Sequence, residues 1–209
     1  MNYKKLCFEM VEHQIKDRGI SNPKLLKVMK QVPRHEFVPH GMRASAYDDS
    51  PLPIGCRQTI SQPYMVALMT DILGLKGDEK VLEIGAGSGY QAAILSKLAK
   101  KVYTIERMKE LAGRTKELLR KLGYENIKVI HGDGTKGYEK QAPYDAIIIT
   151  AASENVPPGL LEQLADNGRL AVPIGPRYHQ ELIRITKKGN KLKEEYFGGC
   201  IFVPLIGDD

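Results

Sequence analysis

The segment Val81-Leu82-Glu83-Ile84-Gly85-Ala86-Gly87-Ser88-Gly89-Tyr90 decides the fold. Its first four residues form a short, largely apolar run, which predicts a buried strand. The three alternating glycines predict a tight turn, and the residues after them have the spacing of a helix. A strand that enters a helix through a glycine loop begins a βαβ unit, so the segment predicts an α/β fold with a ligand site at the loop.

The rest of the chain repeats this alternation. We expect further strands at residues 101–106, 127–131, 144–150 and 169–174, and helices at residues 91–100, 109–122 and 160–165. Strands that alternate with helices predict a mainly parallel, doubly wound sheet. Residues 181–186 and 194–202 surround Lys188-Gly189-Asn190, which predicts an antiparallel C-terminal hairpin at one edge of that sheet.

The N-terminal part does not show this alternation of strands and helices. Helical patterns occur at residues 3–18, after the capping motif Ser21-Asn22-Pro23, and at residues 63–73. The proline-rich stretch 32–57 predicts an irregular surface segment, and long ordered loops are often functional. A length of 209 residues fits one domain, in which residues 1–75 add N-terminal helices to an α/β core of residues 76–209.

Composition argues against several classes of protein. The net charge is +6, but the basic residues are spread along the chain without interleaved aromatic side chains, so we expect no nucleic-acid partner. Cys7, Cys56 and Cys200 are far apart and odd in number, which predicts neither a disulfide framework nor a metal site. No apolar run approaches the roughly 18 residues of a membrane span, and the N-terminus lacks the pattern of a signal peptide. We therefore expect a cytoplasmic protein with no metal and no membrane partner.

The spacing of the glycines indicates the kind of ligand. A dinucleotide-binding loop has the pattern G-x-G-x-x-G, whereas Tyr90 stands here where the last glycine would fall. The loop still allows a ligand to approach the backbone closely. Glu83 places a negative charge where a pyrophosphate would be disfavoured and a cationic amino group favoured. The alternative for Glu83 is that it only braces the loop.

Two more acidic residues follow the next predicted strands. Glu106 ends the strand 101–106, where a carboxylate can accept hydrogen bonds from both hydroxyls of a ribose. Asp133 follows the strand 127–131, and it can accept from an adenine amino group while the Gly134 N–H donates to the ring. The carboxyl ends of parallel strands meet at the ligand-binding edge of an open sheet. The set therefore predicts a nucleoside with a charged amino-acid tail, although a tight turn without a ligand remains the alternative for the loop alone.

The segment Gln58-Thr59-Ile60-Ser61-Gln62-Pro63-Tyr64-Met65 resembles one family in particular, the protein-L-isoaspartate O-methyltransferases. Further matching blocks run in order along nearly the whole chain, at residues 32–34, 37–38, 51–55, 81–91, 131–134, 143–152 and 202–205. The resemblance implies a Rossmann-like class I methyltransferase fold that binds S-adenosyl-L-methionine and releases S-adenosyl-L-homocysteine. It also implies methyl esterification of the free α-carboxylate of L-isoaspartyl residues in damaged proteins and peptides, which starts repair through a succinimide.

The resemblance also implies the residues of the site. The cofactor-binding residues would be Glu83, Gly85, Ala86, Gly87, Ser88, Gly89, Glu106, Arg107, Asp133 and Gly134. The substrate-binding residues, in the substrate-side segment 1–75, would be Thr59, Ile60, Ser61 and Gln62. Ser61 occupies the position to which the family assigns its catalytic role.

Ser61 is expected to orient the acceptor rather than to act as a covalent nucleophile. It lies two residues before Pro63, where a helix should begin, and helix N–H groups favour an anion there. The alternative is that Ser61 only caps that helix. No general base is needed, because a carboxylate with a pKa of about 3.9 is ionised at neutral pH and a sulfonium methyl is already activated.

Two positions depart from the family's pattern. Cys56-Arg57 precedes Gln58 where a glycine-containing spacer is expected, and Ile201 precedes Phe202 where an arginine is expected. Both departures bear on the peptide preference and not on the reaction.

Two other functions have less support. An amino-directed nucleic-acid methyltransferase would carry an Asn/Asp-Pro-Pro-Tyr/Phe block just after the fourth core strand, where this chain has Thr150-Ala151-Ala152-Ser153. The sequence Asn155-Val156-Pro157-Pro158 is only a displaced near match. An adaptor that binds without turnover is disfavoured by the intact glycine loop and by Ser61. We expect a monomer whose substrates are isoaspartyl proteins and peptides.

Overall fold

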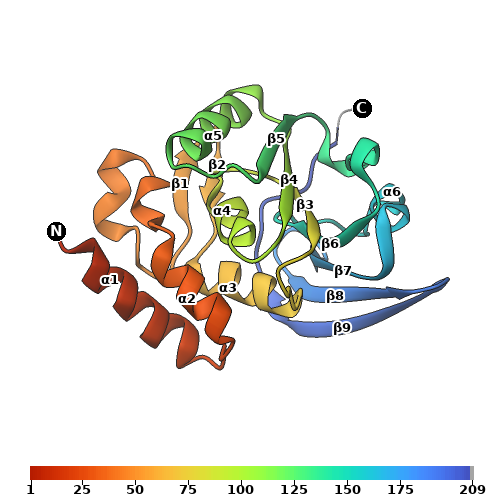
Figure 1. The fold of residues 1–209 in the computed structure, drawn as a ribbon, viewed down its shortest axis with the longest axis horizontal. Coiled ribbons are helices and arrows are strands. Elements are labelled where there is room, and N and C mark those ends of the chain that lie inside the picture. Colours follow the sequence, from red (N-terminus) through yellow and green to blue (C-terminus); the bar gives the residue numbers. More distant parts are fainter. Residues whose placement is uncertain (208–209) are drawn as a thin grey trace.

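The computed structural model of the chain describes residues 1–207, which are built around a seven-stranded sheet (Figure 1). The strand order is β5-β4-β3-β6-β7-β8-β9. The strands are β3 (Lys80–Ile84), β4 (Lys101–Glu106), β5 (Ile127–His131), β6 (Tyr144–Ile149), β7 (Leu164–Ile174), β8 (Gln180–Lys188) and β9 (Lys191–Cys200). The first five strands in this order pair in parallel, whereas β8 pairs antiparallel with both β7 and β9. The mainly parallel sheet with a C-terminal hairpin at one edge is therefore confirmed.

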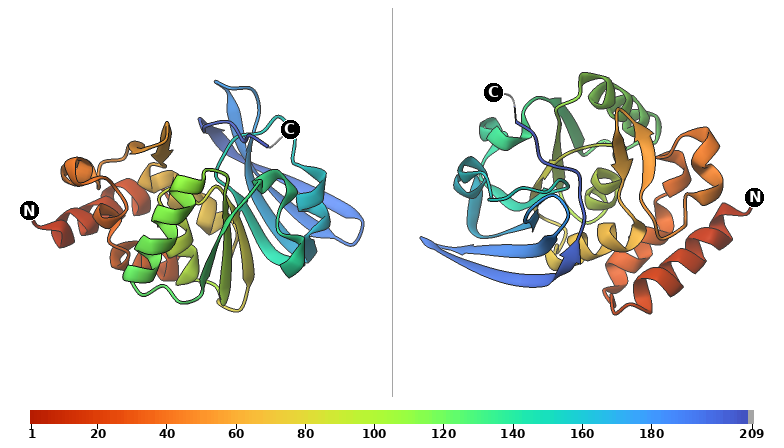
Figure 2. Two further views of the ribbon diagram at one scale, coloured as in Figure 1. Left: turned by 90° about the horizontal axis from the view of Figure 1, so that it is seen from above. Right: turned by 180° about the vertical axis from the view of Figure 1, so that it is seen from behind.

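Helices cover both faces of the sheet (Figure 2). One face packs against α3 (Pro63–Ile72), α4 (Tyr90–Ser96) and α5 (Lys109–Lys121). The other face packs against α6 (Pro158–Glu162) and apolar residues from neighbouring loops. Strand β6 lies in the middle and contributes Ile148 to the first face and Ile147 and Ile149 to the second. This explains its run of isoleucines, since a central parallel strand is buried on both sides.

The N-terminal residues form a helical layer outside the first face. Helix α1 (Tyr3–Glu9) continues as a π-helix (Met10–Lys16), so the helix expected at residues 3–18 is present with a wider last part. Helix α2 (Pro23–Gln31) begins as expected, because the Asn22 side chain accepts from the N–H groups of Lys24 and Leu25.

Three of the expected elements need correction. The helix expected at residues 91–100 ends at Ser96. The stretch 32–57 is not wholly irregular, because strand β1 (Leu52–Gly55) pairs antiparallel with β2 (Gln58–Ile60) in a small separate sheet. Only Leu52 and Ile54 point inward from β1. An alternation of buried and exposed residues this short cannot be recognised in a proline-rich sequence. The helix expected at residues 160–165 ends at Glu162, and β7 already begins at Leu164, where it pairs with Tyr144 across an irregularity in the register.

Among the described residues, no helix combines the length and the apolar character that a membrane span requires.

Candidate active site

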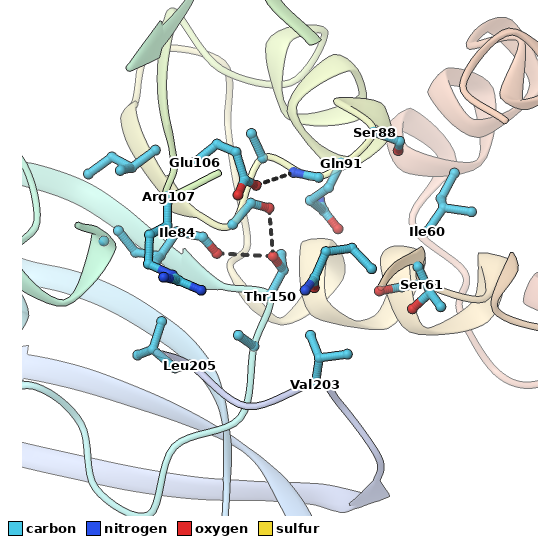
Figure 3. Close-up of a pocket in the computed structure, with 18 of the residues that line it drawn as sticks. Ile60, Ser61, Ile84, Ser88, Gln91, Glu106, Arg107, Thr150, Val203 and Leu205 are labelled. Carbon is cyan, nitrogen blue, oxygen red and sulfur yellow. Dashed lines mark hydrogen bonds between the residues drawn. The ribbon is translucent and has the colours of Figure 1, made fainter. Parts of the chain in front are cut away.

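A cavity lies at the carboxyl ends of β3, β4 and β6, where three parts of the chain meet (Figure 3). Its loop end is formed by Gly85, Ala86, Gly87, Ser88, Glu106, Arg107 and Gly134. Its serine end is formed by Gln58, Thr59, Ile60, Ser61 and Gln91. The C-terminal tail, residues 201–207, closes one side, with Val203 and Leu205 directed toward the cavity. The structure thus brings most of the sequence-predicted residues to one place.

The backbone of the glycine loop is fixed by hydrogen bonds to its own sheet. The N–H groups of Gly85 and Ala86 donate to the carbonyl oxygen of Ile105 at 2.9 and 3.0 Å. Gly85 has a φ of +95°, and a Cβ there would lie 2.5 Å from the Thr150 hydroxyl oxygen. That hydroxyl donates to the carbonyl oxygens of Ile84 and Gly85 at 3.0 and 2.8 Å. Position 85 therefore requires glycine, both for its conformation and for its close approach to Thr150.

Glu106 lies where β4 ends and holds the loop with its carboxylate. One oxygen accepts from the Gly87 N–H at 2.9 Å, and the other accepts from the Met108 N–H at 2.9 Å. The residue is 7% exposed and lines the cavity. Each carboxylate oxygen has a second lone pair, so Glu106 can also accept from two ligand hydroxyls.

Glu83 is completely buried in β3 and does not line the cavity in the described part of the chain. Neither of its carboxylate oxygens has a hydrogen-bond partner among those residues. Burial raises the pKa of Glu83 to about 8, and the charge of Glu106 adds to that rise; the Thr104 hydroxyl lies close enough to lower it in part, although the two groups do not form a hydrogen bond of good geometry. An unpartnered carboxylate beside a glycine loop fits a cationic ligand, since a nearby positive charge would favour its ionised form. The donors and acceptors of the loop end therefore fit S-adenosylmethionine.

Asp133 and Gly134 follow β5, and only Gly134 is among the described residues that line the cavity. One Asp133 oxygen accepts from the Thr135 N–H at 2.9 Å and from the Thr135 hydroxyl at 2.7 Å. The other oxygen lies 3.5 Å from the Lys136 ammonium. Gly134 packs directly on Ile84, where no Cβ would fit. Asp133 thus shapes the turn that presents the Gly134 backbone to the cavity. Gly89, with a φ of +85°, likewise lies outside the described lining and is the N-cap residue of helix α4.

The serine end contains Thr59, Ile60 and Ser61, whereas Gln62 is not among the described residues that line the cavity. Ser61 does not cap α3: the N-cap residue is Gln62, and the Tyr64 N–H donates to Asp49 at 3.2 Å. Within residues 1–207 the Ser61 hydroxyl forms no hydrogen bond to protein. The helix end also already faces a carboxylate, so it is not freely available to a second anion.

Several lining residues were missed by sequence reasoning. Gln91 follows the glycine loop by two positions, and its amide donates to the Thr70 hydroxyl at 2.9 Å. Two main-chain hydrogen bonds hold the tail over the cavity. The Ala152 N–H donates to the carbonyl oxygen of Val203 at 2.8 Å, and the Leu205 N–H donates to the carbonyl oxygen of Ala152 at 2.7 Å. Only the match at residues 202–205 signalled that the tail has a role, and nothing in it gave the path.

No group of three or more His, Cys, Asp or Glu side chains within residues 1–207 is arranged to hold a metal ion.

Comparisons with known proteins identify the family. A sequence profile described as protein-L-isoaspartate(D-aspartate) O-methyltransferase matches residues 7–209. The chain is 50% identical over 209 residues to the protein-L-isoaspartate O-methyltransferase of Syntrophus aciditrophicus, covering 99% of this chain and 96% of that protein. It is 53% identical over 208 residues to the enzyme of the same description from Geobacter metallireducens, with coverage of 99% and 96%.

A solved structure has the same fold. It is a Plasmodium falciparum protein, described as a candidate protein-L-isoaspartate O-methyltransferase in complex with S-adenosyl-L-homocysteine, with a TM-score of 0.84, 28% identity and full coverage of both chains. These matches confirm the Rossmann-like class I methyltransferase fold. The chain belongs to the protein-L-isoaspartate(D-aspartate) O-methyltransferase family.

Proposed function

We propose that Ser61 orients the acceptor in this chain, a protein-L-isoaspartate O-methyltransferase that transfers the methyl group of S-adenosylmethionine to the free α-carboxylate of L-isoaspartyl residues. The observation that carries the proposal is the position of Ser61. Its hydroxyl lies without a hydrogen bond to the described protein residues, in the same cavity as the glycine loop and Glu106. A free donor opposite a nucleoside-binding loop suits an anionic acceptor.

The loop end would hold the cofactor. The backbone of Gly85, Ala86, Gly87 and Ser88 would surround its amino-acid tail, and Arg107 would contact the cofactor next to Glu106. Glu106 would accept from the two ribose hydroxyls, and the Gly134 N–H would donate to the adenine ring. Glu83, Gly89 and Asp133 would act from outside the lining: Glu83 by its charge, Gly89 and Asp133 by fixing backbone turns. When bound, S-adenosylmethionine supplies an activated methyl group on its sulfonium.

The serine end would hold the acceptor. The Ser61 hydroxyl would donate to one carboxylate oxygen, while Thr59 and Ile60 flank the peptide. Val66 and Met69 give that end an apolar wall, which would keep water from the reacting carboxylate. Gln62 would support the site from outside, since its amide approaches Asp49 at 3.4 Å. The chain needs no general base for an ionised carboxylate, and alignment alone can supply on the order of 7–11 kcal/mol.

The same proposal covers the organisation of the chain. Residues 1–75 would form the substrate side and 76–209 the cofactor core of one domain. One copy would suffice, because residues 1–207 supply both ends of the cavity. We expect the protein to act as a monomer in the cytoplasm and not on nucleic acid. Light scattering at working concentration tests the monomer, and a dimer mass would contradict it.

The experiment uses a pair of peptides that differ only in one linkage. Wild-type protein is given S-adenosylmethionine with a labelled methyl group and either an isoaspartyl peptide or its aspartyl twin. We expect a base-labile methyl ester on the isoaspartyl peptide and background label on the twin. Equal label on both peptides, or none on either, would overturn the proposal.

A further inference from the structure

The start of helix α3 is held by residues that lie far from it in the sequence. The Arg18 guanidinium donates to one Asp49 oxygen at 2.6 Å, and its central carbon lies 3.4 Å from the centre of the Tyr64 ring. The other Asp49 oxygen accepts from the Tyr64 N–H at 3.2 Å, and the Gln62 amide approaches the first at 3.4 Å. We call Arg18, Asp49 and Tyr64 the clamp.

The clamp joins helix α3, which lines the cavity through Val66 and Met69, to two segments whose clamp residues do not line it. Arg18 follows the π-helix, Asp49 precedes β1, and Tyr64 is in the first turn of α3. Its bonds act on the backbone and side chains of residues 62–64, directly after Ser61. Movement of this turn would therefore move the Ser61 hydroxyl relative to the loop end.

Asp49 does what a serine at the helix start commonly does. A serine hydroxyl there usually accepts from an N–H of the first turn and is then committed to the helix. In this chain a carboxylate from 15 positions earlier accepts from that N–H instead. Asp49 therefore supplies the cap that the side chain of the N-cap residue Gln62 does not, and it fixes the turn that directly follows Ser61. Arg18 balances the Asp49 charge, so the acceptor does not meet an unpaired anion.

We infer that Asp49, oriented by Arg18, is a positioning residue that fixes the first turn of α3 and so keeps the Ser61 hydroxyl aimed at the acceptor carboxylate. The inference rests on the proposed function of Ser61. Asp49 does not line the cavity in the described residues, and it acts through Ser61 rather than on the substrate.

A double-mutant cycle tests this inference. Wild type, Asp49→Ala, Ser61→Ala and the double variant are compared by kcat and KM for an isoaspartyl peptide and by Kd for S-adenosylhomocysteine. A misplaced orienting group costs roughly ten- to a hundredfold, so we expect Asp49→Ala to lower kcat by at least about tenfold. In the Ser61→Ala background the same change should alter kcat by no more than about twofold, because there is no hydroxyl left to position. The cofactor Kd should stay within about twofold in all four proteins.

Two further variants separate positioning from general stability. Asp49→Asn keeps an oxygen that can accept from the Tyr64 N–H, so we expect it to recover most of kcat. Glu12→Ala is the matched control, because the Lys30–Glu12 ion pair has the same 2.6 Å length and comparable exposure but lies away from the cavity. It should leave kcat unchanged.

The results that would overturn the inference are specific. An unchanged kcat in Asp49→Ala would do so, as would an equal fractional loss of kcat whether the Ser61 hydroxyl is present or has been removed. If Asp49→Ala does not fold, the same cycle with Arg18→Ala decides the matter, because that change leaves the Asp49 acceptor in place. A failure of the proposed function would be seen in a different experiment: the wild-type protein would then methylate the isoaspartyl and the aspartyl peptide equally, or neither of them.

Discussion

The two ends of the cavity are held in place in different ways. The glycine loop is fixed by main-chain hydrogen bonds to the strand beside it and by Glu106, which ends that strand. The serine end is fixed by side chains that reach across the fold. Asp49 binds the first turn of α3, and Arg114 on α5 donates to the carbonyl oxygen of Ile54 in β1 at 3.1 Å. The loop end is thus part of the sheet, while the serine end packs on the sheet through apolar side chains and is oriented by long-range polar contacts.

This difference has a functional meaning. A cofactor that is the same in every turnover can be held by rigid backbone, and a site on regular elements is the most precise. The acceptor is a residue within many different peptides. A two-stranded sheet and a helix start, packed on the core and oriented by a few polar contacts, can present Ser61 without enclosing the rest of the peptide substrate.

The largest expected effect comes from breaking the loop end. Gly85→Ala would force a left-handed φ of +95° on an L-residue and place Cβ 2.5 Å from the Thr150 oxygen. Strain of this kind together with displaced Thr150 hydrogen bonds amounts to about 4 kcal/mol. Because the loop of the free protein can relax and cofactor binding must then restore its geometry, we expect a loss of cofactor affinity of up to roughly a thousandfold. Calorimetric titration with S-adenosylhomocysteine measures it.

The matched control for that variant is Gly123→Ala. Gly123 has a φ of +77° but no atom within 4 Å of its added Cβ. It should lose only the stability associated with backbone strain and keep its cofactor affinity. A Gly85→Ala protein that binds cofactor as wild type does would contradict the rigid-loop description.

The second effect concerns the buried carboxylate of β3. Because folding raises the pKa of Glu83 from 4.5 to about 8, the unfolded chain releases a proton that the folded protein keeps between these values. Stability is therefore lost as the pH rises through this window, and it levels off above about pH 8. Across pH 5.5 to 7.5 the loss is about 1.4 kcal/mol for each pH unit, and Glu83→Gln removes that contribution.

Urea unfolding of both proteins at pH 5.5, 6.5 and 7.5 measures the difference. The wild type should lose stability relative to Glu83→Gln at each step. A difference between the two proteins that does not change with pH would show that Glu83 is ionised throughout.

The smallest effect comes from loosening the serine end. Arg114→Ala removes the hydrogen bond to Ile54, which is worth about 1 kcal/mol. We expect KM for the isoaspartyl peptide to rise by about threefold to fivefold, with cofactor affinity unchanged. Glu110→Ala is the control, since its 3.7 Å contact with Arg114 is a surface ion pair of little value. An equal KM increase in both variants would argue against the Ile54 contact as the cause.

The same contrast explains what the sequence could predict. The loop end was largely predictable, because a strand, three glycines and the acids at successive strand ends are local patterns whose geometry follows from the βαβ unit. The prediction for the loop end differs from the structure only in detail. Glu83 and Asp133 lie outside the described lining, where Glu83 would act through its charge and Asp133 through the backbone turn that it fixes. Cys56-Arg57, which departs from the family's pattern, lies at the β1–β2 turn. Both residues adopt a positive φ there, so this departure concerns only the local conformation of the turn.

The sequence identified the residues of the serine end but did not predict the contacts that hold them in place. Its segment was identified by family resemblance, yet nothing near Ser61 in the sequence points to Asp49 or Arg18. The fold of the tail over the cavity was equally hidden. Contacts between residues far apart in the chain depend on the packing of the whole N-terminal layer, which no local pattern encodes.

The most direct test of the account is the Ser61→Ala protein, studied in a single turnover with cofactor and isoaspartyl peptide both saturating. We predict that methyl transfer slows by about a hundredfold, as expected when an orienting donor is removed, while the Kd for S-adenosylhomocysteine is unchanged. Ser21→Ala, an exposed serine far from the cavity, should match wild type in both measurements. A Ser61→Ala protein with the wild-type transfer rate, or one that loses cofactor affinity in step with its rate, would contradict the division of the cavity into a cofactor end and an acceptor end.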